Sequence, residues 1–261
     1  MRGNTKWIYG KHVLITGASD GIGRELCRNL AGECRKLTLV SRRKDRLQLL
    51  KQELESSGTN IDVCPMDICN IEEIRHLIFG IYEKLHEQVD VFINCAGGSH
   101  VIGPFENMHP SDIAQIFDTN ARAPIFWLRE LLCYMKSNSI KPDEKKRGHI
   151  MMMVSRSSER PLSGLSIYAS AKGAIEKLVE ALQKEYVRHR LVFTLVAPGS
   201  INTSFTASWS KEDRDAHNAE AMAVEEAVLP IIQALNVHYA TNRISYESTA
   251  QWLVEPGVLN L

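Results

Sequence analysis

Short apolar runs alternate with longer amphipathic stretches along almost the whole chain, and this alternation constrains the fold more than any other feature. The short runs predict strands at 11–16, 36–41, 60–65, 89–94, 149–155 and 191–197. Several are apolar almost throughout, as strands covered on both faces of a parallel sheet are. The stretches between them predict helices at 22–32, 43–57, 71–87, 111–137 and 166–188, and the segment 242–248 predicts a seventh strand. The order indicates an α/β fold with a doubly wound parallel sheet of about seven strands and helices on both faces.

The length and composition of the chain fit a single domain over residues 1–261, because no shift in composition along the sequence marks a domain boundary. The 31 basic and 31 acidic side chains give a formal charge of zero, whereas nucleic-acid binders carry a basic surplus, so we expect no nucleic-acid partner. No apolar run reaches the roughly 20 residues that span a bilayer, and the N-terminus shows no signal-peptide pattern. Six scattered cysteines without metal-ligand spacing add to the expectation of a cytoplasmic protein with no metal site.

Ligands of such a sheet bind beyond the carboxyl ends of the strands. The first of these ends carries "TGASDGIG", residues 16–23, between the first strand and the first helix. Gly17, Gly21 and Gly23 would let the backbone approach a pyrophosphate at the helix N-terminus. A tight turn that needs glycine for a positive φ is the structural alternative. The position of the turn favours dinucleotide binding.

The stretch "SIYASAKGA" places Tyr168 and Lys172 four residues apart in an expected helix. Residues at this spacing share one helix face, with Cβ atoms about 5–6 Å apart. Taken alone, the pair is explained by a tyrosine that fills the core and a lysine that reaches solvent. Its meaning changes when it is placed beside the other motifs of the chain.

Six motifs in order resemble the short-chain dehydrogenase/reductase family over roughly residues 11–205. They are the TG-x-x-x-G-x-G turn at 16–23, "NCAG" at 94–97, Asn120, Ser155, the pair Tyr168 and Lys172, and "PGSINT" at 198–203. The resemblance implies a Rossmann-like sheet, a nicotinamide dinucleotide cofactor, and hydride exchange between a carbonyl and an alcohol.

The same resemblance implies which residues contact the cofactor. Asp67 matches the aspartate beside the adenine ring, and Ala96 and Gly97 would let the backbone run close to the adenosine ribose, with Asn94 tying that loop to its neighbours. The backbone of Ile201 would meet the nicotinamide carboxamide, and Lys172 would hold the nicotinamide ribose. The full set expected at the cofactor is Gly17, Ser19, Asp20, Gly21, Ile22, Gly23, Arg42, Arg43, Asp67, Ile68, Asn94, Ala96, Gly97, Tyr168, Lys172, Pro198, Gly199, Ile201 and Thr203.

The end of the second strand bears on the choice between NADP(H) and NAD(H). An acidic residue there would bind the ribose 2′-hydroxyl of NAD, and an arginine would accommodate the 2′-phosphate of NADP. The segment "LVSRRKDR" has Ser41 in place of the acid, then Arg42 and Arg43, which can fork onto phosphate oxygens or simply begin a solvated helix edge. Asp20 argues the other way, because that position is often basic in NADP-preferring relatives. We expect NADP(H), with NAD(H) as the second choice.

A carbonyl that accepts hydride needs a proton on its oxygen, and the resemblance implies Tyr168 as the general acid/base. The unperturbed pKa of tyrosine is about 10. The Lys172 ammonium and an oxidised nicotinamide would both favour the phenolate. Lowering the pKa by about three units takes roughly 4 kcal/mol of differential interaction.

Two further residues complete the catalytic set that the resemblance implies. Ser155, 13 residues before Tyr168, would donate a hydrogen bond to the substrate oxygen, with Ser157 and Ser158 as rivals for that role. The backbone of Asn120 would help to position a water that links Lys172 to bulk proton supply.

Segments near 98–108, 156–165 and 204–222 are expected to form the walls and lid of a substrate site. The helices expected at 111–137 and 166–188 carry broad apolar stripes, and corresponding helices commonly form the dimer seam in this family. We therefore expect a homodimer or homotetramer.

The leading hypothesis is an NADP(H)-dependent oxidoreductase acting on a small-molecule carbonyl or alcohol. The substrate stays open between a lipid-like ketone (3-oxoacyl, sphingoid or steroid) and a small polar carbonyl. A catalytically silent NADP-binding sensor or scaffold is the alternative, and the four catalytic matches argue against it. Epimerase or dehydratase chemistry on the same fold is a third hypothesis, although such relatives usually carry a longer substrate-binding extension.

Overall fold

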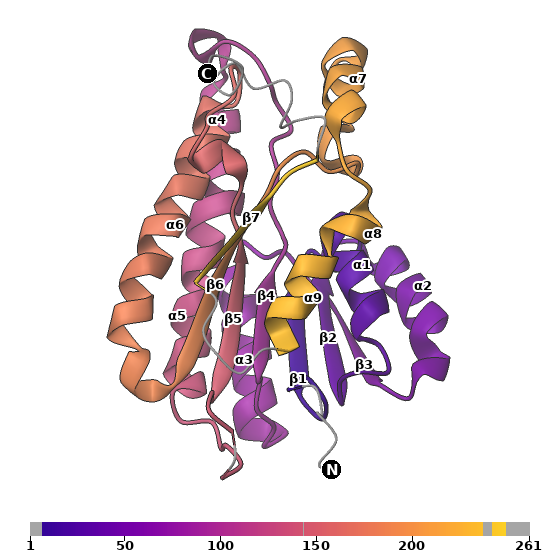
Figure 1. Ribbon diagram of the computed structural model, residues 1–261, viewed down its shortest axis with the longest axis vertical. Coiled ribbons are helices and arrows are strands. Elements are labelled where there is room, and N and C mark those ends of the chain that lie inside the picture. Colours follow the sequence, from indigo (N-terminus) through magenta and orange to yellow (C-terminus); the bar gives the residue numbers. More distant parts are fainter. Residues whose placement is uncertain (1–6, 143, 237–241, 249–261) are drawn as a thin grey trace, which may run out of the picture.

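Seven parallel strands form a single sheet in the computed structural model, which describes residues 7–142, 144–236 and 242–248 (Figure 1). The spatial order is β3-β2-β1-β4-β5-β6-β7, so the strand order reverses between β1 and β4. This confirms the predicted doubly wound sheet, including the seventh strand. The strands are β1 (His12–Thr16), β2 (Lys36–Ser41), β3 (Asn60–Pro65), β4 (Val91–Asn94), β5 (Gly148–Met153), β6 (Leu191–Pro198) and β7 (Arg243–Tyr246).

Helices cover both faces of the sheet, as Figure 1 shows. One face packs against α3 (Ile71–Phe79), α5 (Ala123–Met135) and α6 (Ser166–Glu185). The other packs against α1 (Gly21–Leu30), α2 (Lys44–Leu54) and α9 (Leu229–Asn236). The remaining described helices are α4 (Pro110–Phe117), α7 (Lys211–Glu220) and α8 (Val224–Ala227).

Alternate side chains of the buried strands enter the two layers, as the pleat of a strand requires. In β1, Leu14 belongs to the layer of α3, α5 and α6, whereas Val13 and Ile15 belong to the opposite layer. Phe92 of β4 stacks on Trp127 of α5 with ring centroids 5.6 Å apart. The near-continuous apolar strand sequences are therefore explained by burial on both sides.

The helix expected at 111–137 is interrupted. It consists of α4, a π-helical turn at Asp118–Arg122, and α5. Pro124 lacks the N–H that would bond the carbonyl of Asn120 four residues earlier, and its ring clashes with that carbonyl in a regular α-helix. The wider π turn relieves the clash. The sequence "NARAP" thus places the break at Asn120.

Helical structure also occurs where the sequence predicted only a polar lid. Within 204–222, a short 3₁₀ turn at Ser204–Thr206 precedes α7; α8 and α9 follow beyond this segment. In the part of the chain that the structure describes, no helix combines the length and apolarity that crossing a membrane requires.

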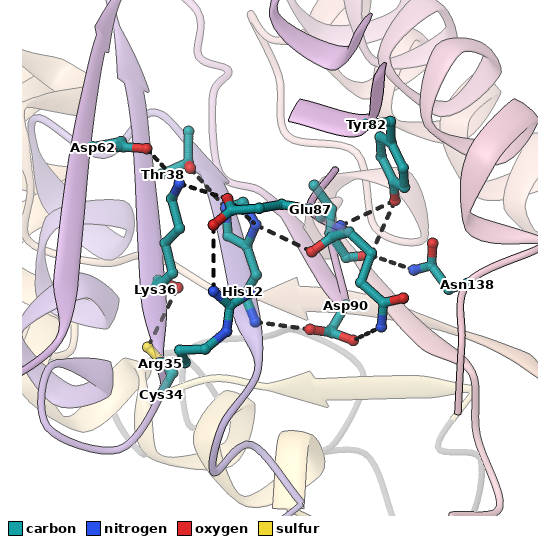
Figure 2. A network of polar contacts seen from close by, with 12 residues as sticks. His12, Cys34, Arg35, Lys36, Thr38, Asp62, Tyr82, Glu87, Asp90 and Asn138 are labelled. Carbon is teal, nitrogen blue, oxygen red and sulfur yellow. Dashed lines mark hydrogen bonds and ion pairs between the residues drawn. The ribbon is translucent and has the colours of Figure 1, made fainter. Parts of the chain in front are cut away.

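A polar network around the buried side chains of His12 and Lys36 lies near the amino ends of β1, β2 and β3 (Figure 2). Lys36 Nζ forms ion pairs with Glu87 at 2.6 Å and Asp62 at 2.7 Å. His12 is fully buried; its Nε2 lies 2.8 Å from Thr38 Oγ1 and its backbone N–H donates to Asp90. This network lies near the amino ends of the strands, whereas the candidate site is expected at their carboxyl ends. The network therefore stabilises the fold and is not part of the candidate site.

Candidate active site

A cavity of about 1000 Å³ opens at the carboxyl ends of the strands. Every residue predicted for the cofactor or for catalysis lines it except Asn94 and Asn120, which are buried behind its wall. The lining set comprises Gly17, Ser19, Asp20, Gly21, Ile22, Gly23, Arg42, Arg43, Asp67, Ile68, Ala96, Gly97, Ser155, Tyr168, Lys172, Pro198, Gly199, Ile201 and Thr203. The fold thus brings together residues that are up to 186 positions apart in the chain, from 17 to 203.

The glycine turn leaves no space for side chains. A Cβ on Gly17, whose φ is +71°, would lie 2.8 Å from the backbone nitrogen of Ala96, and one on Gly23 would lie 2.4 Å from the carbonyl oxygen of Gly17. The strand-to-helix turn is therefore packed backbone against backbone, with the N-terminus of α1 directed at the cavity wall. Such a turn fits a pyrophosphate, which needs close approach to backbone N–H groups.

Gly97 has a comparable role after β4. A Cβ there would lie 2.7 Å from Asn120 Oδ1 and 2.9 Å from Lys172 Nζ. The loop after β4 consequently passes directly over two of the predicted catalytic residues. Asn94 connects this loop to β1, because its Nδ2 donates to the Ala96 carbonyl at 3.4 Å and its Oδ1 accepts from the Thr16 hydroxyl at 2.8 Å.

The Asn120 side chain clamps the same loop. Its Oδ1 accepts from the Gly98 N–H at 2.9 Å, and its Nδ2 donates to the Gly98 carbonyl at 2.7 Å. Nδ2 also lies 2.8 Å from the carbonyl of Ile116 in the preceding helical turn. The fully buried amide therefore joins the π turn between α4 and α5 to the loop after β4.

Tyr168 and Lys172 occupy one face of α6, and both are buried. Lys172 Nζ donates to the carbonyl of Met153 at 2.8 Å and lies 5.7 Å from the centre of the Tyr168 ring. Burial lowers the pKa of Lys172 to about 8. Burial also raises the pKa of Tyr168 to about 12, and a hydrogen bond with Ser155 opposes this only in part. Desolvation, which penalises the charged form, dominates the pKa of Tyr168, and the phenolate-favouring effect expected of Lys172 does not contribute to it.

The three candidate serines differ in their contacts. Ser155 follows β5, caps the next turn by accepting from the Ser157 N–H at 3.1 Å, and bonds Tyr168. Ser158 Oγ lies 2.7 Å from Glu176 Oε2, directed away from the tyrosine. Ser157 is buried. Among the three, the contact with Tyr168 favours Ser155.

The opposite end of the cavity holds the two predicted arginines. Arg42 is exposed at the rim. Arg43 Nη1 instead forms an ion pair with Asp20 at 3.0 Å, and Arg43 Nε donates to Ser19 at 3.0 Å. Arg46, which the sequence did not single out, lies 2.7 Å from the same Asp20 oxygen. Asp20 thus neutralises part of the positive charge on which the NADP(H) expectation depended.

Aromatic and apolar side chains surround Tyr168 on the side away from the glycine turn. Phe205 packs edge-on against Tyr168 with ring centroids 5.5 Å apart, and Trp209 packs against Phe205 at 5.3 Å. Leu165 and Ile116 complete this cluster. Trp209 Nε1 donates to the Ser99 carbonyl at 2.9 Å, which ties the segment 204–222 to the loop after β4.

Several cavity residues were missed by the sequence reasoning. They come mainly from α4 and the turn after it, and from the end of β7; the set includes Ser111, Ala114, Gln115, Thr119 and Glu247. The amphipathic pattern of the helix was visible, but the pattern alone did not show which face would meet the cavity. Among the residues that the structure describes, no group of His, Cys, Asp or Glu is placed to hold a metal ion.

The sequence matches the short chain dehydrogenase family over residues 11–214. The chain belongs to this family of oxidoreductases. A relative described as 11-beta-hydroxysteroid dehydrogenase-like 2, from Arabidopsis thaliana, is 33% identical over 209 residues, covering 78% of this chain and 64% of the relative. The 3-ketodihydrosphingosine reductase of Mus musculus is 31% identical over 211 residues, covering 77% and 60%. The chain therefore spans less than two thirds of the length of both.

Solved structures of the short-chain family share the fold. A short chain dehydrogenase from Burkholderia cenocepacia, in complex with NADP, superposes with a TM-score of 0.80 at 19% identity, covering 94% of this chain and 99% of that one. At this identity the likeness concerns the fold.

Proposed function

We propose that this short-chain dehydrogenase/reductase is NADP(H)-dependent and interconverts a carbonyl and a secondary alcohol, with Tyr168 as general acid/base. One observation carries the proposal. The Tyr168 hydroxyl lies beside Ser155, one helical turn from Lys172, in the cavity that the glycine turn borders. A reacting carbonyl oxygen placed there would meet two hydroxyl donors.

The cavity suits a nicotinamide dinucleotide, because the tightly packed glycine turn and the N-terminus of α1 border it, and such a turn can bind a pyrophosphate. By family resemblance, the turn at 16–23 would hold the pyrophosphate and Asp67 would lie beside the adenine. Ile201 and Thr203 would hold the nicotinamide carboxamide. Thr203 lies close to the glycine turn, since a Cβ added at Gly21 would come within 3.1 Å of its Cγ2. When bound, the nicotinamide supplies or accepts the hydride.

Residues of the chain itself would supply the proton for the carbonyl oxygen and stabilise the negative charge that develops there. With its pKa near 12, Tyr168 is neutral at neutral pH and can donate its proton to the carbonyl oxygen. Ser155 donates a second hydrogen bond as negative charge grows there. Lys172, with its pKa near 8, is mostly cationic at neutral pH and stabilises the tyrosinate that the donation leaves behind.

The apolar surroundings of Tyr168 favour a substrate with a bulky apolar body over a small polar carbonyl. Phe205 packs against the tyrosine ring, and Trp209, Leu165 and Ile116 belong to the same apolar cluster. The names of the two relatives, a hydroxysteroid dehydrogenase-like protein and a 3-ketodihydrosphingosine reductase, agree with a lipid-like ketone. The segments 98–108, 156–165 and 204–222 would form its walls.

Assembly into a homodimer or homotetramer through α4, α5 and α6 is part of the proposal. Phe117 and Ile125 remain exposed there, at 37% and 41% of their surfaces. Large apolar side chains exposed close together on adjoining helices are suited to burial against a second copy.

The test is Tyr168→Phe. Removal of the hydroxyl should reduce ketone-dependent NADPH oxidation by at least about 10²-fold, the lower end of what general acid catalysis contributes. NADPH binding, measured by fluorescence titration, should be retained, because the ring and its packing remain. Turnover at the wild-type rate would refute the assigned mechanism, and Tyr134→Phe serves as a control at an unrelated tyrosine outside the cavity lining.

A further inference from the structure

Glu176 continues the helix face that carries Tyr168 and Lys172. The three residues follow one another at intervals of four in α6, so they share one side of the helix, and all three are buried. An ionisable side chain is seldom buried without partners, because its transfer out of water costs free energy that hydrogen bonds or opposite charges must offset. The proposed function gives this carboxylate no role, although it lies one helical turn from Lys172.

Both oxygens of the Glu176 carboxylate have a partner on another segment. Oε1 accepts from Arg243 Nη1 of β7 at 2.6 Å, and Oε2 lies 2.7 Å from the hydroxyl of Ser158. Ser158 ends the 3₁₀ turn Arg156–Ser158, which directly follows Ser155. One side chain of α6 thus connects this helix both to β7 and to the turn after β5.

Ser158 extends this connection to Ser155. Its Oγ lies 2.7 Å from the Ser155 carbonyl oxygen, as close as it lies to Glu176, and its N–H donates to the same carbonyl at 3.1 Å. The guanidinium that binds Glu176 also contacts the residue after the turn, because Arg243 Nη2 lies 2.8 Å from Glu159 Oε1. Two carboxylates and one guanidinium therefore hold the turn after Ser155 against α6.

We propose that Glu176 is a positioning residue, which fixes the Ser155 hydroxyl relative to the Tyr168 hydroxyl by tying the turn after β5 to α6. The inference rests on the proposed function, in which both hydroxyls donate to the reacting carbonyl oxygen. Glu176 lies outside the cavity lining, so it acts on the reaction through its neighbours. A displacement of about 1 Å at the reacting groups can lower a rate by about 10²-fold.

Alanine and glutamine at this position separate the connection from its charge. Alanine removes both contacts, whereas glutamine has the same length, can accept from Arg243 and can donate to Ser158. Glu176→Ala should therefore lower kcat by about tenfold to a hundredfold, and Glu176→Gln should stay within about threefold of wild type. The KM for NADPH should change by less than about twofold in both variants, because the connection acts on the donors to the carbonyl oxygen.

The decisive measurement combines Glu176→Ala with Ser155→Ala. Loss of the Ser155 hydroxyl should lower kcat by about 10²-fold, as loss of an oxyanion-hole donor does. In that background no Ser155 hydroxyl remains to be positioned, so the addition of Glu176→Ala should lower kcat by less than about twofold more. A carboxylate that only stabilises the fold would lower kcat by the same factor in both backgrounds.

NADPH oxidation is followed with acetophenone and with progesterone, two ketones that have apolar bodies. Glu180→Ala is the matched control, because Glu180 lies one helical turn further along α6 and forms an exposed ion pair with Lys177 at 2.8 Å; its kcat should equal that of wild type. Should Glu176→Ala fail to fold, Ser158→Ala breaks the same connection from the turn, and the same two factors are expected.

Each result separates the hypotheses. A loss of kcat in Glu176→Ala that disappears in the Ser155→Ala background supports the positioning role. Wild-type kcat in Glu176→Ala, a glutamine variant as slow as the alanine variant, or an equal loss in both backgrounds overturns it while the proposed function stands. Full activity of Ser155→Ala removes Ser155 from the proposed function, and the positioning role with it. Reduction of neither ketone by the wild-type protein refutes the proposed function as a whole.

Discussion

Burial acts on Tyr168 and Lys172 in opposite directions, since one is neutral and the other cationic when protonated. The pKa of the tyrosine rises to about 12 and that of the lysine falls to about 8. Tyr168 therefore stays a proton donor over the whole physiological range. The group whose charge changes near neutrality is Lys172. In the proposed mechanism its ammonium would stabilise the tyrosinate and hold the ribose of the cofactor.

The pH dependence of reduction should follow Lys172. Its pKa is depressed, so it is protonated below about pH 8 and loses its charge as the pH rises through that value. The kcat/KM for NADPH, which reports groups of the free enzyme, should be level from pH 6 to 7.5 and fall above pH 8. In Lys172→Arg the falling limb should move beyond pH 10, because arginine keeps its charge. An unmoved limb would assign the pH dependence to another group.

At the scale of elements, the π turn between α4 and α5 is the feature that shapes the site. Pro124 forces the turn, and the turn places the Asn120 amide where it can clamp the loop that passes over Lys172. A side chain in a helix thereby controls the path of a loop after a strand.

Loss of this clamp should destabilise the whole protein. Asn120→Leu would leave the N–H and carbonyl of the half-buried Gly98 without their partner. Each loss should lie in the lower part of the range of about 1–3 kcal/mol for unpaired groups, so the unfolding free energy should fall by about 2–4 kcal/mol. Chemical denaturation measures it. Asn70→Ala, which removes an exposed N-cap of α3, should lower it by only about 1 kcal/mol. Equal losses in the two variants would contradict the clamp.

The sequence predicted the strands, whose local patterns determine their structure. It did not predict contacts between residues that lie far apart in the chain. Apolar runs located the strands, because burial on both faces demands them. The break at Asn120 was encoded by Pro124 but was overlooked in a long apolar stripe. The pairing of Asp20 with Arg43 and Arg46 could not be predicted, because it depends on how the glycine turn meets the start of α2 in three dimensions.

On the scale of the whole molecule, two groups of polar side chains lie at opposite ends of the strands of one sheet. The cavity lies at the carboxyl ends of the strands, and the network around the buried His12 and Lys36 lies at their amino ends (Figure 2). Burial, with a smaller effect of Lys36, lowers the pKa of His12 to about 4. His12 is thus neutral in the folded protein at any pH above this value.

Acid should therefore weaken the fold through His12. Below pH 6.5 the unfolded chain protonates this histidine while the folded protein does not until about pH 4, so stability falls as the pH drops through this window. A difference of about 2.5 pKa units corresponds to about 3 kcal/mol between pH 7 and pH 4. His12→Gln should flatten the dependence in denaturation curves at pH 7, 5.5 and 4.5, whereas His76→Gln, on the surface helix α3, should not. Equal slopes in all three proteins would exclude His12.

The strand order has a consequence for synthesis on the ribosome. Each strand from β2 to β7 pairs with a strand that has already emerged, because the sheet grows outward from β1 first on one side and then on the other. The glycine turn and the end of β2 can therefore form early, whereas Tyr168 and Thr203 arrive late. A nascent chain would acquire the end of its cavity that the glycine turn borders well before the end that holds Tyr168, so the cavity can be complete only after Thr203 has been made.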